Sequence, residues 1–260
     1  MGGGLIQQGE STGVQLLSST RKRLSGLALR RPVLFGIVLT VVWSATMRLL
    51  AAGLSRFFSP EWFPDVLGST LVNLGALLVL LAVVATFGWW RQAGLALPRP
   101  GRSWWTLLPL IFFASSFAAG GLHGSPVQLL SSAVLFLVVG FNEELLYRGV
   151  IQHATNTLGA ERSVVWVAVL YGLQHTAPGI FFGLPPYEIR GLILSSTAFG
   201  AAYAAVRLRI GTIWPLAFSH ALEEFCKARS LGDASPWWHL FEAIFYVFYA
   251  GWLLGRFRTT

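Results

Sequence analysis

The sequence predicts an all-α fold, a polytopic membrane helical bundle of about eight transmembrane helices. Of the 260 residues, 54% are hydrophobic and only 12% are charged, whereas a soluble domain usually carries about a quarter charged residues. The apolar runs are also too long for the helices of a soluble core, because a membrane-spanning helix needs roughly 20 mostly apolar residues. Both observations place most of the chain in a membrane.

Eight apolar segments fit this description, and the fifth and the seventh are shorter than the others. Their expected bounds are 33–54, 66–88, 104–122, 127–149, 162–177, 189–206, 212–226 and 238–255. Residues 1–32 are expected to form a flexible, basic cytoplasmic tail. Residues 33–260 are expected to form one membrane domain, with a core at 127–226 that carries the motifs described below.

Turn-forming residues separate these segments. Pro60 and Pro64 follow the first segment, and the loop 87–103, with glycine, proline and three arginines, links the second to the third. Pro185 and Pro186 lie in the loop before the sixth. Proline and glycine are the strongest local signals for such breaks.

The positive charges indicate how the bundle is oriented. With the N-terminus inside the cell, 14 of the 19 lysines and arginines lie in cytoplasmic segments, four lie outside, and Arg48 lies within the first segment. This distribution follows the positive-inside rule and predicts that both termini are cytoplasmic. The net charge of +8 therefore indicates contact with the lipid bilayer, and no nucleic-acid partner is expected. Arginine outnumbers lysine 17 to 2, which favours a prokaryotic plasma membrane.

Residues 142–148, with the sequence Asn-Glu-Glu-Leu-Leu-Tyr-Arg, place charges inside the fourth segment. Ionisable groups at this depth are energetically expensive and indicate a functional site. Glu144 and Arg148 are four residues apart and can pair along one helix face. Glu143 is left without a local partner and needs a metal, a water or a histidine from another helix, which suits a general base. The alternative is a charge-paired helix end near the cytoplasmic surface.

Two further polar pairs lie in the fifth and seventh segments: Tyr171 with His175, and His220 with Glu224, each four residues apart. His220 and Glu224 share a helix face and could together hold a metal or a water. Two histidines and a carboxylate match a catalytic zinc site with one open position, for which Glu143, His175 and His220 would be the ligands. They match equally well a metal-free site in which Glu143 activates a water, and the spacing does not distinguish the two.

These residues resemble the CPBP family of intramembrane proteases, which includes CAAX prenyl endoproteases and bacteriocin-processing or self-immunity (Abi) proteins. The family's motif Glu-Glu-x-x-x-Arg is matched by Glu143, Glu144 and Arg148. Its second motif, an aromatic residue followed four positions later by histidine, is matched by Tyr171 and His175, with tyrosine in place of the usual phenylalanine.

The third motif of the family, His-x-x-x-Asn or Asp, is matched at His220 and departs from the pattern at Glu224. The resemblance covers about residues 86–226. It implies an intramembrane endopeptidase, either a metallo- or a glutamate-dependent enzyme, in which Glu143 activates water. His175, His220 and Glu224 would hold that water or a metal and stabilise the oxyanion, while Glu144, Arg148 and Tyr171 would support the site.

Two other classes of function stay open at this stage. One is a non-enzymatic membrane protein of the same fold, such as a bacteriocin immunity factor that acts by binding. The other is a proton-coupled transporter, although the internal repeat and paired broken helices typical of transporters are not found in the sequence. The protein substrate is expected in or at the membrane, and a prenylated tail, a bacteriocin leader and a C-terminal sorting signal all stay open. The arginine bias, as a sign of a prokaryote, disfavours the prenylated CAAX tail among them.

Overall fold

The structure is a computed structural model that describes residues 19, 21–57, 66–97, 101–181, 183–232 and 234–256. Within these residues the chain is helical, and the one β feature is an isolated bridge between Leu122 and Ser230. The helical membrane bundle predicted from the sequence is confirmed.

In the first half of the fold, the described residues form three long helices and one short one before the segment that continues α5. Their bounds are α2 (Pro32–Phe57), α3 (Leu67–Phe87), the 3₁₀ turn η2 (Arg102–Leu107) with α4 (Leu108–Ser116), and α5 (Pro126–Glu144). Helix α5 continues as the π-helical segment η3 (Leu145–Ile151), then as α6 (Gln152–Thr155) and η4 (Asn156–Leu158).

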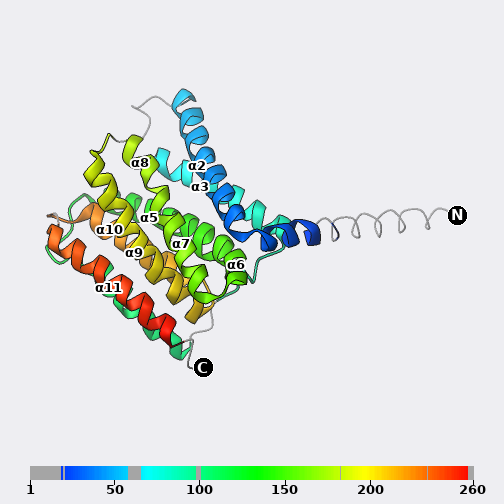
Figure 1. The fold of residues 1–260 in the computed structure, drawn as a ribbon. Helices are drawn as coiled ribbons and strands as arrows, with labels where there is room; N and C mark the ends of the chain where they lie inside the picture. The colour runs from blue at the N-terminus through cyan, green and yellow to red at the C-terminus, as the bar shows by residue number, and fades with distance from the viewer. Residues whose placement is uncertain are drawn as a thin grey trace.

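The described part of the second half forms α7 (Ala160–Gln174), the short α8 (Thr176–Phe181), α9 (Pro186–Ile210), α10 (Trp214–Arg229) and α11 (Pro236–Gly255). Helix α9 packs between α7 and α11, and α5 packs between α3 and α10. In Figure 1, α2 and α11 lie on opposite flanks of the bundle, with α5, α7, α9 and α10 between them.

Among the described residues, four helical segments are long and apolar enough to cross a membrane: Pro32–Arg56, Leu67–Phe87, Pro126–Leu158 and Pro186–Ile210. Helices α7 and α10, with 15 and 16 residues, span only about 22–24 Å at 1.5 Å per residue. The expected shortness of the fifth and seventh segments is therefore confirmed, while the total of eight spans stays a prediction. Helix α4 ends at Ser116, six residues before the expected end of the third segment.

Part of the expected N-terminal tail is helical. Residues 21–30 form a helix, and Arg21 donates hydrogen bonds to the carbonyl oxygens of Ala85 and Thr86 at the end of α3. The side chain of Trp89 also donates to Ser25 Oγ at 2.7 Å. The contacts attach this helix to the bundle, while residues 1–18 of the expected tail lie outside the described residues.

Hydrogen bonds hold the starts of α5 and α10, locally in α5 and from a distant loop in α10. Ser125 caps α5 in a reciprocal capping box with Gln128, and Pro126 occupies the first turn, where its missing N–H costs nothing. The start of α10 is held by the loop after α3, because Thr212 Oγ1 and the Ile213 N–H both donate to the Gly94 carbonyl oxygen. Both helices carry site residues further along, and these contacts fix where each helix starts.

Small residues allow the helices of the interior to approach closely. A Cβ atom at Gly140 of α5 would lie 2.6 Å from the Ala217 carbonyl oxygen of α10. A Cβ atom at Gly172 of α7 would collide with Thr197 of α9. Backbone approach at small residues is a common means of helix association in membranes, where lipid removes the usual hydrophobic driving force.

We expect Gly140→Ala to lower the melting temperature in detergent by several degrees. Overpacking costs about 1–3 kcal/mol, more than the ~0.5–1 kcal/mol that alanine contributes over glycine inside a helix. The matched control is Gly191→Ala in α9, where no atom lies within 4 Å of the added methyl group. Equal melting temperatures of the two variants would contradict the tight contact between α5 and α10.

Candidate active site

The candidate site begins where α5 changes from an α-helix to a π-helix. Glu143 and Glu144 are the last two residues of α5, and η3 starts at Leu145. All seven residues of η3 are buried. Short π-helical segments occur frequently at functional sites, because the wider turn shifts the direction of the side chains.

Glu144 and Arg148 form a fully buried ion pair. Arg148 Nη1 lies 2.9 Å from Glu144 Oε1, and both side chains are 0% exposed. The N–H directions of the guanidinium do not meet hydrogen-bond geometry, so the attraction is mainly Coulombic. The guanidinium carbon also lies 4.3 Å from the centre of the Tyr171 ring and within 5.6 Å of the Phe199 and Tyr203 rings. The pair expected from the i,i+4 spacing is present, and aromatic faces add cation–π stabilisation.

Glu144 also binds His220 from α10. Its Oε1 atom lies 3.0 Å from His220 Nδ1. A carboxylate accepts hydrogen bonds, so Nδ1 carries the proton in this contact. The other ring nitrogen, Nε2, is thereby directed toward Tyr171 and Glu143, and the Tyr171 hydroxyl lies 3.4 Å from it. Glu144 thus orients the histidine, as a carboxylate does in a catalytic triad.

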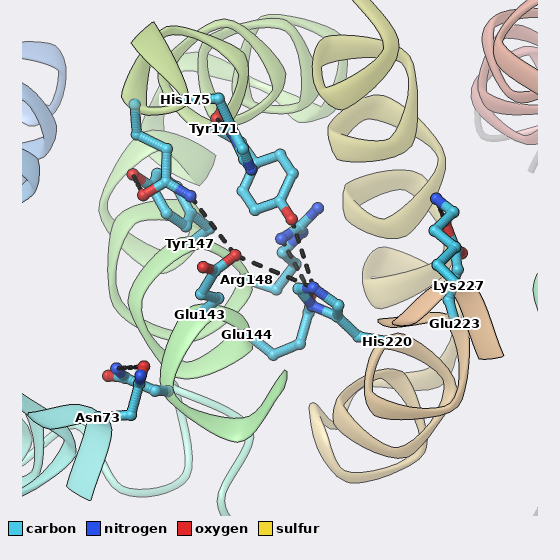
Figure 2. A network of polar contacts seen from close by, with 12 residues as sticks. Asn73, Glu143, Glu144, Tyr147, Arg148, Tyr171, His175, His220, Glu223 and Lys227 are labelled. Carbon is cyan, nitrogen blue, oxygen red and sulfur yellow. Dashed lines mark hydrogen bonds and ion pairs between the residues drawn. The ribbon is translucent and has the colours of Figure 1, made fainter. Parts of the chain in front are cut away.

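Glu143 stands on the other side of this histidine. Its Oε2 atom lies 3.9 Å from His220 Nε2, and its side chain is 15% exposed. Figure 2 shows the two side chains pointing toward each other from α5 and α10. The distance is too long for a direct hydrogen bond, but a single water can contact two polar groups at this separation. Of the two adjacent glutamates, Glu143 is the one whose side chain has exposed surface.

His175 lies at the end of α7, close to Tyr171 and apart from the pair of Glu143 and His220. Its Nδ1 atom donates to the Tyr171 carbonyl oxygen at 2.8 Å, and its ring packs edge-on against the Tyr171 ring. No hydrogen bond or ion pair joins it to Glu143 or His220 in the part of the chain described here. Because Nδ1 holds the proton, Nε2 is left to accept a hydrogen bond.

The expected association of His220 with Glu224 is replaced by the contact between His220 and Glu144. Glu224 is half-buried one turn further along α10, and among the described residues no hydrogen bond or ion pair connects it to His220. Tertiary packing brings a carboxylate from α5 to the histidine, and spacing within α10 could not indicate this.

The described residues do not form a metal site in this arrangement. No group of three or more histidine, cysteine, aspartate or glutamate side chains among them is placed to hold a metal ion. Glu143 and His220 approach each other, but His175 does not join them. The geometry therefore does not fit a zinc site made by these three residues, and no step below passes through a metal.

Two polar connections at the site were not anticipated from the sequence. Gln174 Nε2 donates to Glu143 Oε2 at 3.4 Å, and Tyr147 donates its hydroxyl proton to Gln174 Oε1 at 2.8 Å. Asn142, next to Glu143, is held by Asn73 of α3 and Trp43 of α2 at 3.1 Å each. Polar residues within apolar segments were a signal that could have drawn attention to Gln174 and Asn73.

A second buried charge cluster lies between α10 and α11. Lys227 Nζ lies 2.6 Å from Glu223 Oε1 and 3.9 Å from Glu242 Oε2, and Tyr246 donates to Glu223 Oε2 at 3.3 Å. In Figure 2, Glu223 and Lys227 lie apart from the group around His220. The cluster joins α10 to α11 and is separate from the candidate site.

The long apolar helices of the bundle indicate an integral membrane protein, and the carboxylates and histidines in its interior are the candidate site. Residues 125–226 match the model of a protein family described as Type II CAAX prenyl endopeptidase Rce1-like. The matched segment contains all three motifs, which confirms the resemblance to the CPBP family and indicates a protease. No curated protein matches the chain.

We expect Arg148→Ala to destabilise the protein strongly, because Glu144 would be left as an uncompensated buried charge. Loss of one partner of a buried pair costs about 3–5 kcal/mol. Thermal unfolding in detergent and the yield of folded protein measure this effect. Arg162→Ala is the control, since that arginine is exposed on α7. A normal melting profile of Arg148→Ala would show that the pair does not stabilise the fold.

Proposed function

We propose that the protein is an intramembrane endopeptidase that hydrolyses a peptide bond in a membrane-associated or lipid-modified protein, using a water activated by Glu143. The main support for this proposal is that Glu143 Oε2 lies 3.9 Å from His220 Nε2, in a ring that the buried Glu144 orients. The family match over the same residues supports the reaction class.

The two glutamates would have different roles, one in orienting His220 and the other in proton transfer. Glu144 has no exposed surface and is engaged by Arg148 and His220, so it orients and does not accept the proton of water. Glu143 is partly exposed and would take a proton from the water as the water oxygen attacks the peptide carbonyl. The same carboxyl group would then pass the proton to the leaving nitrogen, giving a new carboxylate and a new amine.

The oxyanion formed in this attack would need donors beside Glu143. The Tyr171 hydroxyl lies on that side of the site and can donate, and His220 would donate from Nε2 once its ring carries a second proton. His175, whose Nε2 accepts, would help to hold the water beside Tyr171. Preorganised donors at a developing charge commonly supply the largest single part of catalysis. Glu224, half-buried on the same helix as His220, would contribute at the edge of the site.

We expect purified protein in detergent to cleave a farnesylated peptide with a CAAX-type end, and Glu143→Gln to reduce kcat by about 10²–10⁴-fold, because a general base is lost. Mass spectrometry of the products measures both. Glu188→Gln, at an exposed glutamate of α9, is the control and should keep full activity. The same peptide without its lipid tests whether the farnesyl group is required.

Metal analysis and treatment with 1,10-phenanthroline belong in the same experiment. The proposal expects no stoichiometric zinc and undiminished cleavage in the chelator. Activity lost in the chelator and restored by zinc would support the metal alternative. Undiminished turnover by Glu143→Gln would overturn the assignment of the base and favour a protein that acts by binding alone.

We further propose a prokaryotic plasma membrane as the location, with both termini in the cytoplasm, on the basis of the arginine distribution. Reporter domains fused to each terminus and inserted at His123, which is exposed between α4 and α5, measure this. We expect the termini on the cytoplasmic side and His123 on the opposite side. Termini on opposite sides of the membrane would contradict an even number of spans.

A further inference from the structure

Gln174 connects the proposed base to a buried tyrosine. It is the last residue of α7, and its two amide ends face different partners. The Nε2 end donates to Glu143 Oε2 at 3.4 Å, and the Oε1 end accepts from the Tyr147 hydroxyl at 2.8 Å.

The chemistry of the three groups fixes the direction of this chain. A carboxylate only accepts hydrogen bonds, so the NH₂ end of the amide must face Glu143. The oxygen end is then directed at Tyr147, whose hydroxyl can donate to it. Tyr147 has 0% exposure and packs edge-on against the Tyr171 ring. Because the tyrosine is immobilised, it holds the amide in one orientation.

The contact acts on the oxygen that matters for the proposed chemistry. Glu143 Oε2 is the atom that faces His220 Nε2 and also the atom that accepts from Gln174. The carboxylate is partly exposed, so packing alone does not hold it. Helix α7 is fixed to α9 independently, through the close approach at Gly172, and does not need Gln174 for its position.

We propose that Gln174 is a positioning residue for Glu143, and that Tyr147 acts through Gln174. The effect on rate rests on the proposed function, because it presupposes Glu143 as the base. Both residues occupy variable positions inside the motifs: Tyr147 lies between Glu144 and Arg148, and Gln174 lies between Tyr171 and His175. The amide keeps Oε2 turned toward His220, so that a water between them meets a carboxylate that is already oriented.

The experiment compares Gln174→Met, Tyr147→Phe and the double variant, with the farnesylated peptide as substrate. Gln174→Met keeps the length of the side chain and removes both hydrogen bonds. We expect its kcat to fall about ten-fold, the loss typical of one hydrogen bond to a charged group, with KM within roughly two-fold of the wild type. Tyr147→Phe should lower kcat about three-fold, and it should have no further effect in the Gln174→Met background, since residues that act as one unit are not additive.

The matched control is Gln152→Met. Gln152 is also buried in the bundle, but its amide donates to the Ala204 carbonyl oxygen and not to Glu143. This variant should keep the wild-type kcat. A kcat of Gln174→Met within two-fold of the wild type, an equal loss in the control, or additive losses in the double variant would each overturn the proposal.

An infrared measurement separates this inference from the proposed function. The carboxylate band of Glu143 is identified as the band lost in Glu143→Gln, and its frequency depends on the hydrogen bonds that the carboxylate accepts. We expect it to shift in Gln174→Met and not in Gln152→Met. An unshifted band would overturn the inference even if cleavage is observed. A shifted band in a protein without any peptidase activity would support the contact and reject the proposed function.

Discussion

An arginine and a glutamate with no exposed surface lie in the interior of an apolar bundle, and much of the site is arranged around them. Taking two charges out of water costs several kcal/mol per ion, so favourable contacts with the surrounding residues must offset this cost. Three contacts offset this cost: Arg148 lies 2.9 Å from Glu144, aromatic rings face the guanidinium, and His220 donates to the carboxylate. These partners come from η3, α7, α9 and α10. The pair, with Glu144 on α5 and Arg148 on η3, therefore connects these two segments to α7, α9 and α10.

This connection gives two neighbouring glutamates different environments. Glu144 is fully buried and contacts both Arg148 and His220. The side chain of Glu143, in contrast, is 15% exposed. The division depends on backbone geometry, because adjacent residues of a helix point about 100° apart. It also depends on α10 lying close enough to α5 for a histidine to reach both carboxylates. Gly140 permits that approach, and the polar contacts of Asn142 with Asn73 and Trp43 limit rotation of α5.

Local spacing predicted some of this arrangement and could not predict the rest. The long apolar helices and the pairing of Glu144 with Arg148 follow from hydropathy and from i,i+4 geometry, and both are present. The partner of His220 is different. Within α10 the spacing pointed to Glu224, but the close packing of α5 on α10 supplies Glu144. The contact of Gln174 with Glu143 joins residues 31 positions apart, and the π-helical turn at Leu145 has no signature in composition. Such features arise from tertiary packing, which overrides local preference.

The orientation of His220 is the element on which the proposed mechanism depends most, and its ring nitrogens can be observed directly. Protein labelled with ¹⁵N-histidine, with His220 assigned by its absence in a His220→Asn variant, reports which nitrogen carries a proton. The account predicts that Nδ1 is protonated in the wild type, because it donates to Glu144 Oε1 at 3.0 Å. An unprotonated Nδ1 with a protonated Nε2 would contradict it, since the histidine would then not be held by Glu144 with Nε2 directed at Glu143.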